Sequence, residues 1–192
     1  MKKFGFIIVC IFACGCLKAQ EAGKINVFGG FVLGTAAGID DDGSSKTQLG
    51  VNLGVEYFII NEISAAPSYS SFFESEAGAD GAEITAKFNA INLDGRYYFY
   101  ENEFRLYGLL GVAILNYEIE TPPFLVGSGG GGTSVITFSP GETIDDTEVG
   151  LNLGGGIVLP IIERLSINGE IKYQTPGDGQ LVVKAGVLFG IN

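Results

Sequence analysis

The sequence predicts an all-β fold: an eight-stranded antiparallel up-and-down transmembrane β-barrel. Apolar side chains alternate with glycine, asparagine and charged residues over eight segments of about ten residues or more. Because alternate side chains of a strand point to opposite faces, each segment has one apolar face and one small or polar face. The connectors between the segments alternate between long and short, as in outer-membrane barrels. Seven charged residues in the interiors of these segments lie on the same side as the glycines and asparagines, so we place them inside the barrel.

The length and charge of the chain narrow its class. At 192 residues it is predicted to form one domain. No apolar run after the N-terminus reaches the roughly 20 residues that a transmembrane helix needs. The formal net charge is −11, and without residues 1–19 it becomes −14, from 8 basic and 22 acidic side chains. Nucleic acid is therefore excluded as a partner, since phosphate binding needs a basic surface.

The N-terminus has the pattern of a signal peptide. Lys2 and Lys3 precede an apolar run at residues 4–17, and Ala19 offers a small residue for cleavage. We therefore predict a signal peptide at residues 1–19 and an outer-membrane β-barrel domain at residues 20–192. All three cysteines fall within the signal peptide, so the exported chain would contain no disulfide. An alternative makes Cys16 the lipidated residue of a lipoprotein signal.

The first three predicted strands are residues 24–35, 48–59 and 62–73. In the second, Leu49, Val51 and Leu53 alternate with Asn52 and Glu56. The third contains a proline at position 67, which removes one hydrogen-bond donor from the ladder. Residues 36–47 are predicted to form a polar loop, and residues 60–62 a short turn.

The next two predicted strands are residues 84–99 and 104–117. Leu93 lies on the apolar face of the fourth strand, and Asp94 and Arg96 lie on the opposite face. An acidic loop at residues 74–83 precedes this pair, and a short polar connection at residues 100–103 joins it. Residues 118–147 are predicted to be the one long irregular segment of the chain.

The last three predicted strands are residues 149–159, 164–174 and 180–191. The sixth reads VGLNLGGGIVL, with valine, leucine and isoleucine on one parity and glycine and asparagine on the other. A turn near residues 160–163 and the TPGDG sequence at residues 175–179 separate these strands. An even strand number returns both termini to the periplasmic side, so the connectors beginning near residues 36, 74, 118 and 175 would be external.

Charged residues on the inward parity predict a network inside the barrel. Buried charges persist only when they are paired, and an eight-stranded barrel is just wide enough for its own side chains to fill. We therefore expect a lumen closed by salt bridges rather than a pore. On the outward parity, Tyr57, Tyr97, Phe99 and Tyr173 suit the aromatic girdles at the membrane interfaces. The predicted lumen charge network consists of Glu56, Asp94, Arg96, Arg105, Glu170, Lys172 and Lys184.

Three sequences within this pattern carry a family resemblance: INLDGRYYF at residues 91–99, RLYGLLGVA at 105–113 and VVKAGVLFG at 182–190. With the signal peptide and the eight alternating strands, they resemble the outer-membrane protein β-barrel family. That family includes the small barrels similar to outer-membrane proteins A and X. The resemblance implies a Gram-negative outer membrane, contact with its lipid and lipopolysaccharide, and delivery by the barrel assembly machinery. Family barrels usually end in an aromatic residue, whereas this chain ends Phe189-Gly190-Ile191-Asn192.

Two motifs point to ligands only weakly. Residues 127–132 satisfy G-x-G-x-x-G, but strand-forming residues and not a helix follow them, so we expect a glycine-rich loop and no cofactor. The acidic runs at residues 40–42 and 145–146 carry calcium-type ligands, but their spacing does not match an EF-hand loop. We expect solvated loops there and no metal site.

A structural or interaction role fits the sequence better than catalysis. The chain contains no histidine, the usual general base of lipid-modifying outer-membrane enzymes, and only rim carboxylates such as Glu118 or Glu148 remain as an alternative. We predict no catalytic residues and no enzyme. The external segments, above all residues 118–147, would meet an extracellular ligand or partner. The alternatives are a soluble lipocalin-like carrier, whose inward parity would have to be apolar, and a narrow channel.

Overall fold

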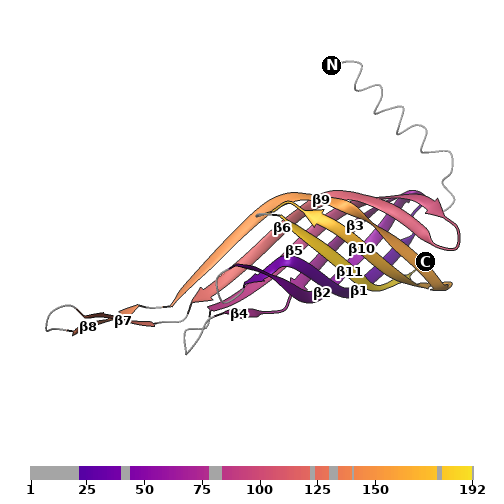
Figure 1. Cartoon of the computed structure of the whole chain (residues 1–192). Coiled ribbons are helices and arrows are strands. Elements are labelled where there is room, and N and C mark those ends of the chain that lie inside the picture. The colour runs from indigo at the N-terminus through magenta and orange to yellow at the C-terminus, as the bar shows by residue number, and fades with distance from the viewer. Residues whose placement is uncertain are drawn as a thin grey trace, which may run out of the picture.

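Eight long antiparallel strands close into a barrel (Figure 1). The structure, a computed structural model, describes residues 22–39, 44–77, 84–121, 124–129, 134–139, 141–176 and 179–191. The predicted signal peptide at residues 1–19 lies outside these ranges. The barrel strands are β1 (Ile25–Ile39), β2 (Ser45–Ile60), β3 (Ile63–Phe72), β5 (Ile84–Glu101), β6 (Arg105–Thr121), β9 (Glu142–Ile162), β10 (Leu165–Gln174) and β11 (Gln180–Gly190).

Each strand pairs with the next one around the barrel, and β11 pairs with β1 to close the ring. A closed ring leaves no unpaired sheet edge, which a sheet in lipid requires. The predicted fold class is confirmed. In the ranges that the structure describes, no helix is long and apolar enough to cross a membrane.

The prediction of a long irregular segment at residues 118–147 is wrong. β6 and β9 stay paired as far as Thr121 and Glu142, and β7 (Phe124–Gly129) and β8 (Ser134–Ser139) form a hairpin. This hairpin projects beyond the same end of the barrel as the short strand β4 (Ser75–Ala77) (Figure 1). Two strands that leave a bilayer side by side continue to satisfy each other's backbone hydrogen bonds. Beyond the bilayer, β6 and β9 no longer need an apolar outer face. Their sequences therefore lose the alternating pattern that identifies a strand.

The connector between β1 and β2 at this end is also shorter than predicted, because β1 runs to Ile39 and β2 begins at Ser45. At the opposite end the turns lie at residues 61–62, 102–104 and 163–164. The last turn begins at the end of the predicted one at residues 160–163, since β9 continues to Ile162. We call this end the turn end and the other the extended end.

Two predicted irregularities occur as expected. Pro67 lies within β3 opposite Leu93 of β5, and it coincides with a gap in the β2–β3 pairing between Gly54 and Tyr57. In the turn after β10, the Gly179 N–H donates to the Pro176 carbonyl over 3.2 Å. Gly179 has a φ of 80°, a left-handed conformation that glycine adopts without steric cost.

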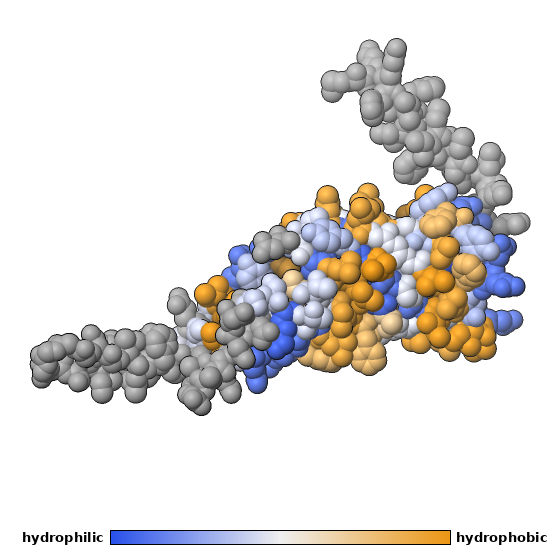
Figure 2. All heavy atoms as spheres, viewed as in Figure 1, coloured by the Kyte–Doolittle hydropathy of each residue, from blue (hydrophilic) through white to orange (hydrophobic). Residues whose placement is uncertain are grey.

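Most leucine and valine side chains of the strands face outward, and most buried polar side chains face the barrel axis. Leu53 and Leu153 are 67% and 65% exposed, whereas Asn52 and Asn152 beside them are buried. Figure 2 shows hydrophobic residues over the middle of the visible face, with hydrophilic residues toward both ends. The outward tyrosines also follow the prediction, since Tyr57 and Tyr97 are 47% and 56% exposed. An apolar outer face and a charged centre exclude the lipocalin-like alternative, which is soluble and would have an apolar ligand cavity.

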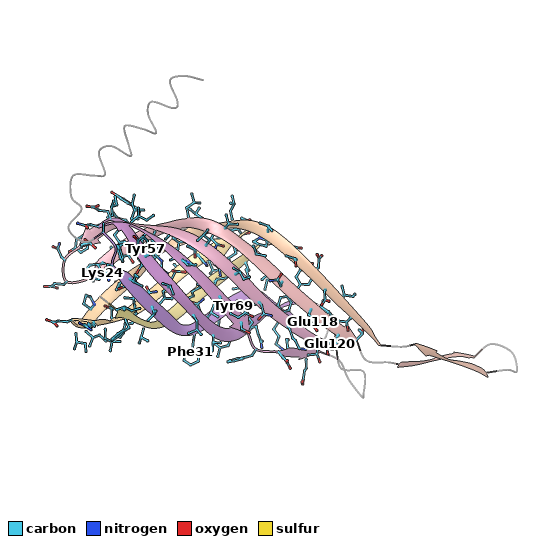
Figure 3. The ribbon with its side chains drawn as sticks, turned by 180° about the vertical axis from the view of Figure 1, so that it is seen from behind. Lys24, Phe31, Tyr57, Tyr69, Glu118 and Glu120 are labelled. Atoms are coloured by element: carbon cyan, nitrogen blue, oxygen red, sulfur yellow. The ribbon has the colours of Figure 1, made fainter. Side chains whose placement is uncertain are left out.

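The outward apolar band ends on β5, β6 and β9 at Ile91, Ile114 and Val149. Beyond them the outward positions carry polar or charged groups, among them Lys87 and Glu118. We define the extension as residues 84–89, 116–121 and 142–148, where the three strands rise beyond the band. Figure 3 shows Glu118 and Glu120 in this region and Lys24 at the opposite end of the barrel.

Candidate functional site

The centre of the barrel is built around Arg96 of β5, which is 2% exposed. Its Nη1 lies 3.3 Å from Glu56 Oε1 of β2, and its Nη2 lies 2.7 Å from Glu170 Oε2 of β10. The central carbon of its guanidinium lies over the rings of Phe28 and Tyr107, at 4.9 and 4.8 Å from their centroids. Arg96 therefore joins both sides of the lumen through ionic and cation–π contacts.

Glu56 is fully buried, and polar neighbours surround its carboxylate. Oε1 accepts hydrogen bonds from the hydroxyls of Ser64 (2.8 Å) and Tyr98 (2.7 Å), and Oε2 accepts one from Asn26 Nδ2 (3.0 Å). A carboxylate taken out of water loses its hydration, and these donors replace it.

Glu170 connects Arg96 to two lysines. Its Oε2 accepts a hydrogen bond from the Tyr107 hydroxyl (2.9 Å), and its Oε1 lies 3.3 Å from Lys184 Nζ and 4.0 Å from Lys172 Nζ. Lys172 Nζ in turn lies 2.7 Å from Asp94 Oδ2. The ionic layer, as we call this set, holds three acids and three bases and is electrically neutral. Its members are Glu56, Asp94, Arg96, Glu170, Lys172 and Lys184.

Arg105, the seventh residue of the predicted network, lies apart from this layer. It is the first residue of β6, close to the turn end, and it is only half-buried. Its guanidinium lies over the rings of Tyr98 and Phe58, at 5.3 and 5.9 Å, and forms no ion pair with any residue that the structure describes. Its parity is inward, but its height on the strand keeps it from the acids.

A second set of side chains, the amide layer, lies next to the ionic layer on the side of the extended end. Asn152 Nδ2 donates to Asp94 Oδ1 (2.7 Å) and Asn92 Oδ1 (3.0 Å), and Gln174 Nε2 donates to Asn92 Oδ1 (2.7 Å). Gln180 Nε2 then donates to Gln174 Oε1 over 3.2 Å. Sequence reasoning considered only charged residues, although the inward parity of these amides was the signal that could have found them.

Apolar layers lie on both sides of this polar centre. Sequence reasoning did not predict these layers, because on the inward side of the strands it looked mainly for small, polar and charged residues. Toward the turn end lie Phe58, Tyr98, Tyr107, Leu109 and Val158. Toward the extended end lie Val32, Ala37, Phe72, Ala86, Phe88 and Val182.

Inward glycines provide the room for these large side chains. A Cβ on Gly156 would collide with the Tyr107 hydroxyl, and one on Gly111 would collide with Asp94 Oδ1. The glycine-rich parity that the sequence shows therefore matches the sizes of the side chains on the neighbouring strands.

Inside the barrel, cavities remain mainly at the two mouths, and a further hollow of about 480 Å³ lies on the outer wall at Gly95 and Gly108. The cavity at the turn end measures about 430 Å³ and that at the extended end about 210 Å³. Beside Lys184, at the height of the ionic layer, the volume is only about 10 Å³. That is about the size needed to hold one water molecule.

The outward face of the extension is acidic around a single lysine. Lys87 Nζ lies 3.0 Å from Glu120, 3.9 Å from Glu118 and 4.0 Å from Glu74. The hydrogen bond between Lys87 and Glu120 raises the pKa of Lys87 and lowers the pKa of Glu120. The hydrogen bond that Glu118 shares with Glu120 raises the pKa of Glu118. On the inward face, the hydrogen bond to Asp146 raises the pKa of Tyr117 to about 12.

The raised pKa of Glu118 predicts a pH-dependent effect of Glu118→Gln. A carboxyl whose pKa is higher in the folded state destabilises that state while it is charged, and the penalty disappears as the pH falls through the pKa. Glutamine keeps a hydrogen-bond donor for Glu120 and carries no charge. We expect about twofold higher amide protection factors in the extension at neutral pH, and no difference below the ordinary carboxyl pKa of 4.5. Hydrogen exchange at both pH values measures this, and lower protection at neutral pH would contradict it.

The two candidate ligand motifs gain no support from the described residues. Residues 40–42, and residues 130–132 of the glycine-rich motif, lie outside them. Gly127–Gly129 lie in β7, and the segment that follows is the strand β8. In the described part of the chain, no group of three or more histidine, cysteine, aspartate or glutamate side chains could hold a metal ion.

The family of the chain follows from its closed barrel, its apolar band and a match in sequence. The profile of the outer membrane protein beta-barrel domain matches residues 6–187. The chain belongs to the outer membrane protein beta-barrel family. This barrel accordingly resides in the cell outer membrane, as the fold and the band of outward leucines and valines require.

Solved structures share the fold of this outer-membrane barrel. The attachment invasion locus protein Ail of Yersinia pestis, in complex with the heparin analogue sucrose octasulfate, superposes with a TM-score of 0.59 at 18% identity, over 89% of this chain and 100% of Ail. The N-terminal barrel of Pseudomonas aeruginosa OprF superposes with a TM-score of 0.56 at 16% identity, over 90% of this chain and 100% of the OprF barrel. OprG of the same organism superposes with a TM-score of 0.52 at 15% identity, over 92% of this chain and 99% of OprG. No curated protein matches the sequence.

Proposed function

We propose that this protein is a structural outer-membrane barrel with a closed lumen, which presents its extended end to a ligand or partner outside the cell. The observation that carries the proposal is the neutral ionic layer, which lies between two apolar layers inside the barrel. Delivery by a signal peptide at residues 1–19 and by the barrel assembly machinery is part of the proposal, as is contact with lipopolysaccharide.

The ionic layer argues against steady conduction. A hydrated ion would have to displace Arg96 from two carboxylates at 2.7 and 3.3 Å, and then pass the buried rings of Tyr98 and Tyr107. Breaking a buried ion pair costs about 3–5 kcal/mol, because the remaining charge is left without a partner. The cavity of about 10 Å³ beside Lys184 offers no continuous path for water. These contacts support a closed lumen.

The extended end supports the presenting role. The extension rises beyond the apolar band, and within the described chain the β7–β8 hairpin pairs only with itself. A hairpin that forms no part of the barrel adds nothing to barrel closure and is available for contacts. Catalysis is not part of the proposal, because the rim acids Glu118 and Glu148 serve as partners of Lys87 and Tyr117.

Conductance in planar lipid bilayers tests the closed lumen. We expect no steady openings from the full chain, nor from a variant in which a short glycine–serine link replaces residues 124–139, because the contacts that close the lumen lie inside the barrel. A reconstituted porin is the positive control, and different gel mobility of unboiled and boiled samples verifies folding. Steady openings of the full chain would contradict the proposal. Openings of the shortened variant alone would place the closure in the hairpin.

A further inference from the structure

The mouth of the extended end contains a cavity of about 210 Å³ with one apolar wall. Phe88 of β5 and Leu115, Tyr117 and Ile119 of β6 line this wall. The rings of Phe88 and Tyr117 lie 6.2 Å apart and are inclined by 29°, so they form a continuous aromatic surface. Polar groups come from two other strands: Glu148 of β9, which is paired with Leu115 of β6, lies at the rim, and Gln180 of β11 lies toward the amide layer.

Gln180 supplies a buried acceptor without a donor. The residue is 3% exposed, and its Nε2 is engaged with Gln174 Oε1. Its Oε1 has no hydrogen-bond partner among the residues that the structure describes. A buried polar atom left unpaired costs free energy, and a donor from a molecule in the cavity would remove that cost.

The rim of the cavity carries two carboxylates, those of Asp146 and Glu148, which share a single hydroxyl donor. The Tyr117 hydroxyl lies 2.9 Å from Asp146 Oδ2 and 3.4 Å from Glu148 Oε1, but it has only one proton to donate. Neither acid forms an ion pair within the described chain. The rim can therefore accept hydrogen bonds from a cation, and it repels anions.

We infer that this mouth binds a small arylalkylamine that carries a second donor on its ring. The ammonium lies at the rim, where Glu148 and Asp146 accept its N–H groups. The ring packs on Phe88 and Tyr117, and the distal hydroxyl or N–H donates to Gln180 Oε1. This occupant matches the charge of the rim and supplies a donor for the acceptor groups at both ends of the cavity. The inference concerns the mouth alone and does not depend on whether the lumen conducts.

Three compounds of nearly equal size separate the contribution of the ammonium group to binding from that of the distal hydroxyl. Tyramine has both donors, 2-phenylethylamine lacks the distal hydroxyl, and 3-(4-hydroxyphenyl)propionate replaces the ammonium with a carboxylate. Calorimetric or NMR titration of the full chain in lipid nanodiscs, with empty nanodiscs as a blank, measures their affinities. We expect tyramine to bind about tenfold more tightly than 2-phenylethylamine, and the propionate not to bind. Binding of the propionate as tight as that of tyramine, or no binding of tyramine, overturns the inference.

Two variants test the named residues. Glu148→Gln keeps the shape of the rim and should weaken tyramine binding about tenfold, since a charge-assisted hydrogen bond is lost. Gln180→Met should abolish the preference for tyramine over 2-phenylethylamine. Glu163→Gln, at the turn end, is the matched control and should bind like the natural chain. Gel mobility of unboiled samples confirms that each variant is folded, and equal affinities of Glu148→Gln and Glu163→Gln would overturn the assignment.

Discussion

Replacement of Arg96 by methionine should lower the free energy of unfolding by about 3–5 kcal/mol. The substitution leaves Glu56 buried without any cation and removes the shortest ionic contact of Glu170. Methionine still fills most of the space between Phe28 and Tyr107. The loss in free energy of unfolding therefore comes mainly from the missing charge and less from lost packing. A buried carboxylate without its partner is more costly than the pair is stabilising, which is why a single variant has a large effect.

Urea unfolding in lipid vesicles, followed by the mobility of unboiled samples on gels, measures this change. Arg164→Met provides the control, because Arg164 is an exposed arginine in the turn between β9 and β10, where a cost within about 0.5 kcal/mol is expected. Arg96→Lys should fall between the two, since lysine keeps the charge but cannot contact both carboxylates with a planar fork. If Arg96→Met and Arg164→Met unfold at the same urea concentration, the ionic layer contributes no stability.

Gly156→Val should prevent most of the chain from folding into the barrel. A Cβ at this position meets the Tyr107 hydroxyl and lies 2.6 Å from the backbone oxygen of Gly169. Tyr107 would have to move, and its hydrogen bond to Glu170 would be lost. Overpacking of this kind costs about 1–3 kcal/mol, and a hydrogen bond to a charged group contributes about 1.5–3 kcal/mol more.

Gly108→Val is the matched control for this substitution. Gly108 lies on the outward face of β6, and a Cβ there has no atom within 4 Å. A β-branched side chain favours the strand conformation and faces lipid, so folding should be unchanged or slightly improved. The fraction of folded protein on unboiled gels compares the two variants. Equal folded fractions would show that inward glycines are not required for space.

Alternation along single strands was enough to predict the class of fold. At Asn152 and Leu153, as at Asn52 and Leu53, the polar residue faces inward and the leucine faces lipid, as the parity indicated. Parity follows from the covalent geometry of an extended chain, so it can be read without knowledge of neighbouring strands. The lengths of the strands were less accessible, because β6 and β9 continue beyond the bilayer, where lipid no longer imposes an apolar pattern.

What the sequence determined by itself is which residues face the axis. Which of them meet was decided by the tertiary structure: Arg96 lies between Glu56, 40 residues earlier, and Glu170, 74 residues later. Arg105 faces the lumen as Arg96 does, yet it lies at the turn end and forms no ion pair among the described residues. The physical reason is that parity is a local property of one strand. The height of a side chain in the lumen is set by the register between strands, and register forms only when the barrel closes.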